Sequence, residues 1–192
     1  DGVRTMVSTA LLLVAVGIII NVVTTTGIGN AFSLMIVEWA QGSLFITLVL
    51  VALASLVLGM GLPVTASYIV LATLSAPLIY DLISQSALLD AILIGIQAGD
   101  LPNNVAATLS LFGGDPLIAL QEMPLEMKQL IRQEMLPDDL LTGMLLSAHL
   151  IIFWLSQDSN VTPPVCVASF AAAGIAGTNP MATGLTSWKV AK

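Results

Sequence analysis

Charged side chains are scarce in this chain. Only 9% of its 192 residues are charged, whereas soluble globular domains carry about 25%. Hydrophobic residues make up 57% of the sequence, and the mean hydropathy is +0.98. A chain this apolar cannot cover its own surface with polar groups unless it forms a very large soluble oligomer. We therefore expect a lipid bilayer to be part of its solvent.

Basic residues are scarcer than acidic ones. Five lysines and arginines stand against twelve acidic residues, which gives a net charge of −7. The five bases form no cluster, so the sequence has no footprint for nucleic acid, and no partner of that kind is expected. Five bases are also too few to set a membrane orientation from the positive-inside bias. Acidic residues concentrate in 115–139, which we interpret as an aqueous insert.

Cysteine and histidine each occur once. With Cys166 alone there is no internal disulfide and no thiolate metal site, and its apolar surroundings favour a packing role. His149 suits either a proton relay or a hydrogen-bonded packing residue, and we favour packing. The nucleotide motif G-x-x-x-x-G-K-[ST] is absent, so nothing supports ATP-driven pumping. Without an initiator methionine or a signal peptide, the chain is expected to be a fragment of a longer protein.

Long apolar runs are what the sequence does contain. Residues 6–28 are uncharged and long enough to cross a membrane, and 30–41 fit a short interfacial helix with Trp39 as an anchor. Residues 88–98 are apolar but short. Together with the runs described next, these segments predict an all-α, polytopic membrane protein.

A helix break is predicted at 59–65, between the uncharged runs 44–58 and 66–80. Each run is shorter than the ~20 residues that a full crossing needs. Two glycines and Pro63 would interrupt a continuous helix. One interpretation is a pair of half-helices, whose freed carbonyls and the hydroxyls of Thr65 and Ser67 could bind sodium. The other is a proline-kinked helix with no ligand.

A second break is predicted at 158–163, between the apolar runs 140–157 and 165–177. Two successive prolines, Pro163 and Pro164, cannot continue a helix. Two polar breaks within ~100 residues are the recurrent pattern of a secondary transporter core.

These patterns divide the chain into three parts. Residues 1–80 hold a transmembrane helix and a helical hairpin, and 140–192 hold the discontinuous helix. Residues 81–139 form a mixed connection. Within it, 98–114 fit either a re-entrant hairpin or an amphipathic surface segment, and 115–139 fit a loop with one or two short helices. No function is assigned to this connection.

Both breaks carry a family resemblance. The stretch 59–72 (GMGLPVTASYIVLA) resembles the motif G-M-G-L-P-T-T-A-A-Y-I of tripartite ATP-independent periplasmic transporters, in the fused-permease branch. Residues 159–165 (SNVTPPV) and 171–177 (AAAGIAG) resemble the family segment S-D-[IV]-T-P-P-V … A-A-x-G-I-A-G. The N-terminal run through 27–29 also fits. The resemblance covers about 1–80 and 145–190.

The resemblance implies a multi-pass permease of the bacterial inner membrane that is not an enzyme. It would take a small organic anion from a periplasmic substrate-binding protein, with uptake driven by the sodium gradient. The fold would be an elevator-type transporter of two inverted repeats, with the first repeat outside this chain. On this basis the candidate Na⁺ and substrate ligands are Gly59, Gly61, Pro63, Thr65, Ser159, Asn160, Thr162 and Pro163.

One departure from the family pattern concerns a candidate ligand. Asn160 stands where the family motif has an acid, and Asp158 lies two residues earlier. Asp158 would supply the missing charge only from a displaced position on the helix. The substrate's identity does not follow from the sequence.

Two other classes of protein share single features with this sequence. An intramembrane aspartyl protease needs two facing aspartates; Asp81 and Asp100 lie at the edges of apolar runs, and Gln97 breaks the required G-x-G-D pattern. A passive channel or a non-transporting scaffold subunit is the second alternative. Uptake that needs both a sodium gradient and a binding protein separates the transporter from it.

Overall fold

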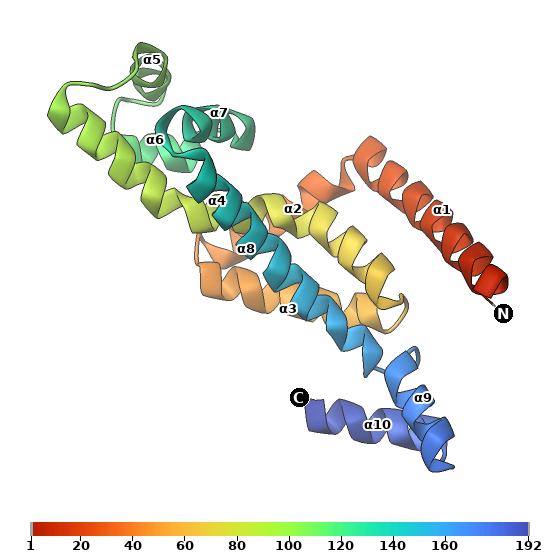
Figure 1. Ribbon diagram of the computed structural model, residues 1–192. Coiled ribbons are helices and arrows are strands. Elements are labelled where there is room, and N and C mark those ends of the chain that lie inside the picture. The colour runs from red at the N-terminus through yellow and green to blue at the C-terminus, as the bar shows by residue number, and fades with distance from the viewer. Residues whose placement is uncertain (1, 192) are drawn as a thin grey trace. The chain divides into compact units, whose positions relative to one another are not determined.

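Every element that the structure describes is helical. The computed structural model describes residues 2–191, over which it has ten α-helices and one short 3-10 helix (Figure 1). This confirms the predicted all-α class. The contacts divide the chain into two units, one formed by residues 1–78 and 149–192 and the other by 79–148.

Two helices are long and apolar enough to cross a membrane, among the residues described. They run from Val64 to Ala98 and from Asp138 to Asn160. Two shorter apolar helices, Leu44–Gly59 and Val167–Ala176, fall below the length of a crossing. Each short helix adjoins one of the two predicted breaks.

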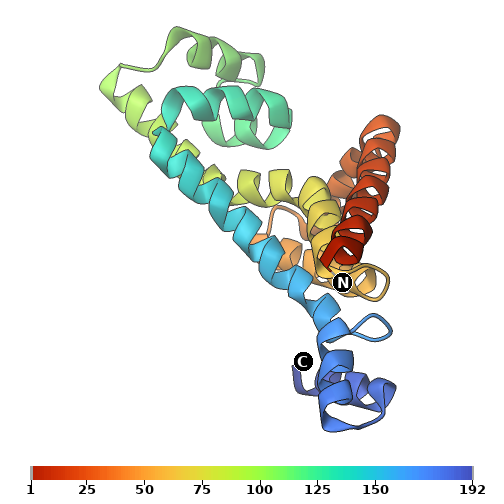
Figure 2. The ribbon, with the colours of Figure 1, turned by 45° about the vertical axis from the view of Figure 1, so that its right-hand side comes forward.

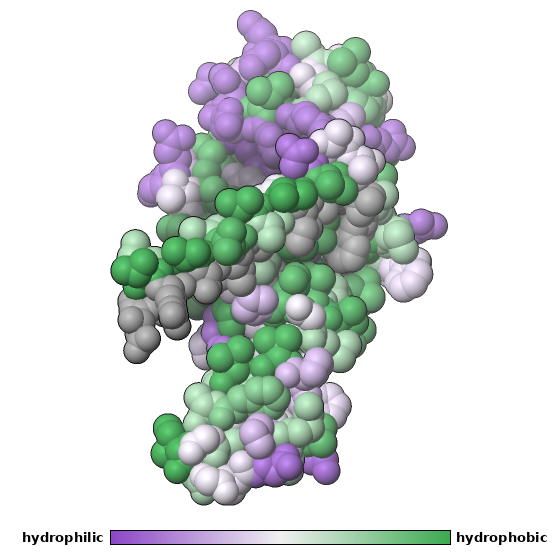
Figure 3. Space-filling view, turned by 90° about the vertical axis from the view of Figure 1, so that its right-hand side faces the viewer, coloured by the Kyte–Doolittle hydropathy of each residue, from purple (hydrophilic) through white to green (hydrophobic). Residues whose placement is uncertain are grey.

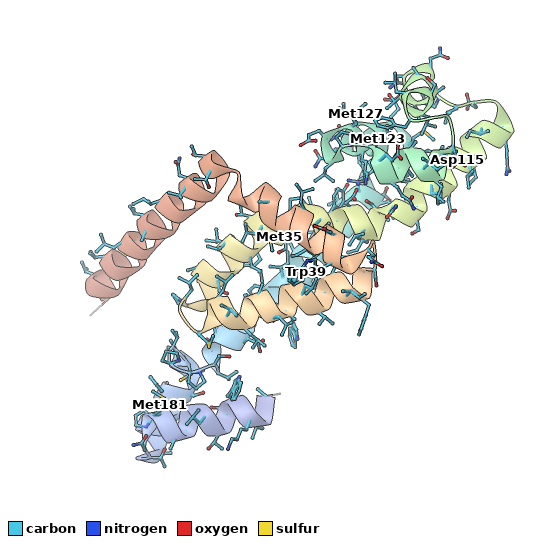
Figure 4. All side chains as sticks on the ribbon, turned by 180° about the vertical axis from the view of Figure 1, so that it is seen from behind. Met35, Trp39, Asp115, Met123, Met127 and Met181 are labelled. Carbon is cyan, nitrogen blue, oxygen red and sulfur yellow. The ribbon has the colours of Figure 1, made fainter. Side chains whose placement is uncertain are left out.

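The first unit begins with α1 (Gly2–Thr26) and α2 (Ile28–Ala40), joined at Gly27 with a φ of 69°. Both were expected to be helical from their apolar runs. On α2, Met35 and Trp39 are exposed one turn apart, whereas Ile36 and Ala40 are buried (Figure 4). The helix therefore has apolar side chains on an exposed face as well as on a buried one. The amphipathic, interfacial helix expected over 30–41, with Trp39 at a membrane surface, stays a prediction.

A helix–turn–helix follows where the first break was predicted. Helix α3 (Leu44–Gly59) starts with the Ser43 hydroxyl accepting from the N–H of Ile46, and it ends at Gly59. Helix α4 (Val64–Ala98) begins four residues after Met60. The break therefore lies inside 59–65, while its re-entrant placement in a membrane stays a prediction.

Helix α4 is longer than the sequence indicated. The apolar run was expected to end at residue 80, but the helix continues through Pro77 and Asp81 to Ala98. The acidic Asp81 resembled the edge of an apolar run, yet it is buried within the helix and paired with two bases from α7. Because Lys128 and Arg132 neutralise the Asp81 carboxylate, this residue can be buried in the middle of the helix. Gly99, with a φ of 68°, then ends it.

The second unit packs three short helices against the C-terminal half of α4. They are α5 (Asn103–Leu111), α6 (Pro116–Glu122) and α7 (Leu125–Met135), and Figure 2 shows them grouped beside α4. Val105 and Leu109 of α5 are buried in a shared core with Leu88 and Ile92 of α4. Residues 98–114 thus contain a short helix whose apolar face packs on a helical core, which is the arrangement expected of an amphipathic segment.

The remaining two insert helices match the expectation for 115–139. The carboxylate of Asp115 caps α6 by accepting from the N–H groups of Leu117 and Ile118. Met123, between α6 and α7, is buried in the core, and Met127 of α7 packs against it (Figure 4). Hydrophilic side chains gather over this unit in Figure 3. Its exposed acidic residues are Asp90, Asp100, Asp115, Glu122, Glu126, Glu134, Asp138 and Asp139.

The second break follows α8 (Asp138–Ser156). The helix tightens into the 3-10 turn η1 (Gln157–Asn160), and the chain turns again before α9 (Val167–Ala176). Helix α10 (Pro180–Ala191) then packs back on α9, where the Ser169 and Ser187 hydroxyls lie 2.5 Å apart. Cys166 is fully buried, as its predicted packing role requires.

Candidate functional site at two helix breaks

The first break is a tight turn closed by backbone hydrogen bonds. The carbonyl of Leu58 accepts from the N–H groups of Gly61 and Leu62, at 3.0 and 2.9 Å. The carbonyl of Pro63 accepts from the N–H of Ser67 at 2.9 Å and opens α4. The C-terminal end of α3 and the N-terminal end of α4 therefore meet within a few residues.

The second break has a similar arrangement of backbone bonds. The carbonyl of Asp158 accepts from the N–H groups of Val161 and Thr162, at 3.1 and 2.9 Å. The carbonyl of Thr162 accepts from the N–H of Cys166, and the Pro163–Pro164 peptide between them is cis. Here too a helix C-terminus, that of α8, is followed closely by a helix N-terminus, that of α9.

Hydroxyl groups bind the carbonyls at the end of α8. The last carbonyls of an α-helix have no N–H partner in the helix itself. Ser156 donates to the Phe153 carbonyl at 2.7 Å, and Ser159 donates to the Ser156 carbonyl at 3.0 Å. The Leu155 carbonyl accepts from Ser55, which lies on α3, at 2.9 Å.

The two breaks pack directly against each other. A Cβ added to Gly59 would lie 3.2 Å from both the Cα and the N of Ser159. Only a glycine allows this approach without displacing the backbone of the break. Residues that are 100 positions apart in sequence are thus in contact, at Ser55 with Leu155 and at Gly59 with Ser159.

The eight candidate ligands differ in burial. The structure buries Gly59, Ser159 and Thr162, leaves Pro63, Asn160 and Pro163 half-buried, and exposes Gly61 and Thr65. Of these it brings Gly59 and Ser159 into direct contact. Thr65 lies in the first turn of α4, where its hydroxyl is exposed.

A cation binds to the lone pairs of an oxygen, so a buried hydroxyl can bind one only if its proton points elsewhere. Because Ser159 gives its proton to the Ser156 carbonyl, its oxygen lone pairs remain available. The Thr162 hydroxyl is buried, and no partner for it is found among the described residues. A buried hydroxyl without a partner is costly, so Thr162 fits a position that a ligand satisfies. The Asn160 side-chain N–H donates to Gln157, which leaves its own carbonyl oxygen as an acceptor.

One family profile matches nearly the whole chain. The profile, described as "Tripartite ATP-independent periplasmic transporter, DctM component", covers residues 1–190. The chain belongs to the DctM family. No curated protein and no solved structure matches it.

Membership in the DctM family agrees with the resemblance found at the two motifs, and it makes the chain part of a transport permease. It also extends the similarity over the insert helices, which the motifs did not cover. The sodium coupling, the substrate and the delivering protein are not part of what the family match establishes.

Ser67, whose hydroxyl was a possible sodium ligand at the first break, is fully buried in the first turn of α4 in this DctM-family chain, and its hydroxyl has no partner among the described residues. Ser55, by contrast, escaped prediction as a site residue. Ser55 was overlooked because it lies in the uncharged run before the break. A four-residue spacing in that run, from Thr47 and Val51 to Ser55 and Gly59, was the available signal.

His149 has the packing role that was favoured for it. Its Nδ1 lies 3.0 Å from the Tyr68 hydroxyl, and the Tyr68 ring makes an edge contact with Phe153. The ring is half-buried between α4 and α8.

Asp81 and Asp100 do not resemble a catalytic aspartate pair. In the second unit, Asp81 is ion-paired with Arg132, and its second oxygen lies 3.2 Å from the Lys128 ammonium. The Arg132 guanidinium also lies 5.0 Å above the Tyr80 ring. Asp100 is exposed beyond the end of α4. The two carboxylates have opposite surroundings, which gives the protease alternative no support.

Proposed function

We propose that this permease couples the uptake of a small organic anion to the entry of sodium across the bacterial inner membrane. The anion would be received from a periplasmic substrate-binding protein. The observation that carries the proposal is the contact between the two helix breaks, at Gly59 and Ser159. In the family context, such a contact is suited to a shared ion site.

Helix polarity supports a cation at this contact. A helix C-terminus carries a partial negative charge, because the peptide dipoles align along the helix and its last carbonyls have no N–H partner within the helix. Gly59 ends α3, and Ser159 lies in the turn that ends α8, so two such ends meet. Sodium binds carbonyl and hydroxyl oxygens at the ends of broken helices in transporters. The available oxygens include the hydroxyls of Ser159 and Thr162.

Helix polarity also supports an anionic substrate. Each break is followed by the N-terminus of a helix, at Val64 for α4 and at Val167 for α9. Helix N-termini present unpaired N–H groups and favour carboxylates. We propose that these ends face the substrate, with part of the site contributed by a first inverted repeat outside this chain. The proposed motion is of the elevator type.

The proposal is tested by uptake into proteoliposomes that contain the full-length permease with its other membrane parts. We expect accumulation of a carboxylate substrate only when the binding protein is added and an inward sodium gradient is imposed. An equal potassium gradient is the control and should give no accumulation. Equilibration without a sodium gradient would contradict the proposal and favour a passive channel, and absence of flux under all conditions would favour a scaffold subunit.

A further inference from the structure

The buried residues of α3, the first helix of the helix–turn–helix, lie along a single line. Its buried positions recur every fourth residue, at Thr47, Val51, Ser55 and Gly59. Residues at this spacing lie one above the other on one face of an α-helix. The face ends at Gly59, which is the point of contact with Ser159.

Ser55 differs from three helical hydroxyls elsewhere in this chain. The hydroxyls of Thr25, Thr73 and Ser147 each donate to the carbonyl four residues earlier in their own helix. Ser55 is fully buried and instead donates to the Leu155 carbonyl of α8, at 2.9 Å. It therefore links two helices where its counterparts serve only one.

The two contacts of α3 have matching spacing. Ser55 and Gly59 are four residues apart, and so are their partners Leu155 and Ser159. Two contacts at equal spacing fix the axial register between α3 and the end of α8. A slip of one turn, about 5.4 Å, would remove the Ser55 bond and would also move Gly59 away from Ser159.

We infer that Ser55 is a positioning residue for the cation site: its hydrogen bond to Leu155 sets the register that places the hairpin turn on the second helix break. This inference rests on the proposed function, since it concerns the same site. Ser55 does not itself need to touch the ion. Its hydroxyl binds the Leu155 carbonyl. This bond keeps α3 in the position at which Gly59, four residues later, contacts Ser159.

The first test is the sodium dependence of uptake by the Ser55→Ala permease. One neutral hydrogen bond contributes enough to change an equilibrium about fivefold to tenfold. We therefore expect the sodium concentration for half-maximal uptake to rise about fivefold to tenfold, with the rate at saturating sodium largely retained. Ser55→Thr keeps the hydroxyl and should restore the sodium dependence. Ser55→Cys keeps the volume with a much weaker donor and should resemble Ser55→Ala.

Thr73→Ala is the matched control, because it also removes one helical hydroxyl, but one whose bond stays within α4. Its sodium dependence should equal that of the parent. If Ser55→Ala and Thr73→Ala both leave a sodium-dependent parent unchanged, the inference is wrong while the proposed function stands. If the parent itself shows no sodium dependence, the proposed function has failed, and the distance measurement described next decides whether Ser55 sets the register.

The register has a readout that does not involve sodium. Val57 on α3 and Trp154 on α8 are both exposed, so spin labels can be attached there in a full-length background whose native cysteines are replaced. We expect one narrow distance distribution in the parent and in Thr73→Ala. Ser55→Ala should broaden it or add a second distance. An unaltered narrow distribution in Ser55→Ala would overturn the register claim even if uptake had changed.

Discussion

Gly59 is the residue on which the contact between the two helix breaks depends. A Cβ there would meet the Cα and N of Ser159 at 3.2 Å, and backbone atoms cannot move aside like the end of a flexible side chain. Gly61 lies in the same turn but has open space, since a Cβ would come no nearer than 3.9 Å to the Leu58 carbonyl. The two glycines are therefore predicted to respond differently to the same substitution.

Gly59→Ala is expected to weaken sodium dependence far more than Gly61→Ala. Overpacking of a close contact costs about 1–3 kcal/mol, and about 1.4 kcal/mol corresponds to a tenfold change in an equilibrium. The sodium concentration for half-maximal uptake should thus rise roughly tenfold or more in Gly59→Ala. It should change little in Gly61→Ala, whose backbone carbonyl is kept. Equal effects of the two substitutions would show that the contact with Ser159 does not control the site.

At the residue scale, the sequence could identify which residue types belong to the site but not their burial. Thr65 and Thr162 were equivalent candidates, because both are hydroxyl residues beside a break. The structure exposes Thr65 and buries Thr162, whose hydroxyl has no partner among the residues that the structure describes. Ser55 was missed because its role comes from a neighbour 100 residues away in sequence. The four-residue spacing around Ser55 could indicate a shared helix face, but no local pattern identifies the partner of that face on α8.

At the scale of helices, both breaks were predictable because glycine and proline act locally on the backbone. The extent of α4 was not, since it depends on the pairing of Asp81 with Arg132 and Lys128. Lys128 and Arg132 lie 47 and 51 residues further along the chain than Asp81. The predicted boundary between 1–80 and 81–139 therefore falls inside α4. The division of the chain into these functional parts stays a prediction.

Arg132→Met is expected to destabilise the second unit by about 3 kcal/mol, because it leaves a buried carboxylate without its closest counter-charge. Arg132 is 1% exposed, and Asp81 is 7% exposed. Lys128→Met should destabilise the unit less, because the Lys128 side chain is more exposed than that of Arg132. Ion pairs that are closer to solvent contribute about 1 kcal/mol or less to stability. Hydrogen exchange of the α7 amides in the full-length permease measures both effects.

A double variant separates the charge pairing from simple packing. Replacing Asp81 by leucine together with Arg132→Met removes the carboxylate as well as the guanidinium, so much of the lost protection should return. If the double variant is as unprotected as Arg132→Met alone, the ion pair is not the source of the stability.

Burial also lowers the pKa of Lys128 from its ordinary value of 10.5. The folded unit therefore releases this proton at a lower pH than the unfolded chain does. Between the two pKa values the unfolded state holds more protons, so the contribution of Lys128 to stability improves as the pH rises. The lowered pKa shows that burial of the Lys128 ammonium near Asp81 carries a desolvation cost. This cost offsets part of the attraction between the two charges, so Lys128→Met should destabilise the unit less than Arg132→Met.

For the molecule as a whole, the chain combines two helix breaks in one unit with a helical insert in the other. The all-α class followed from composition and apolar runs, and the family followed from the two motifs and is established by the match over 1–190. The insert's own core could not be foreseen, because its members come from α4 to α8 and contain no motif. Six of the eight exposed carboxylates of this unit lie within 115–139, the segment that was expected to be aqueous.

The most direct test of the central claim is the effect of sodium on the thermal unfolding of the purified full-length permease. Sodium at about 100 times its Kd should stabilise the folded state by about 2.7 kcal/mol, whereas potassium at equal ionic strength should not. Thr162→Ala should reduce this stabilisation, and Thr162→Ser, which keeps the hydroxyl, should retain it. Equal stabilisation of the parent by sodium and potassium, or unchanged sodium affinity in both Thr65→Ala and Thr162→Ala, would contradict a sodium site at the two helix breaks.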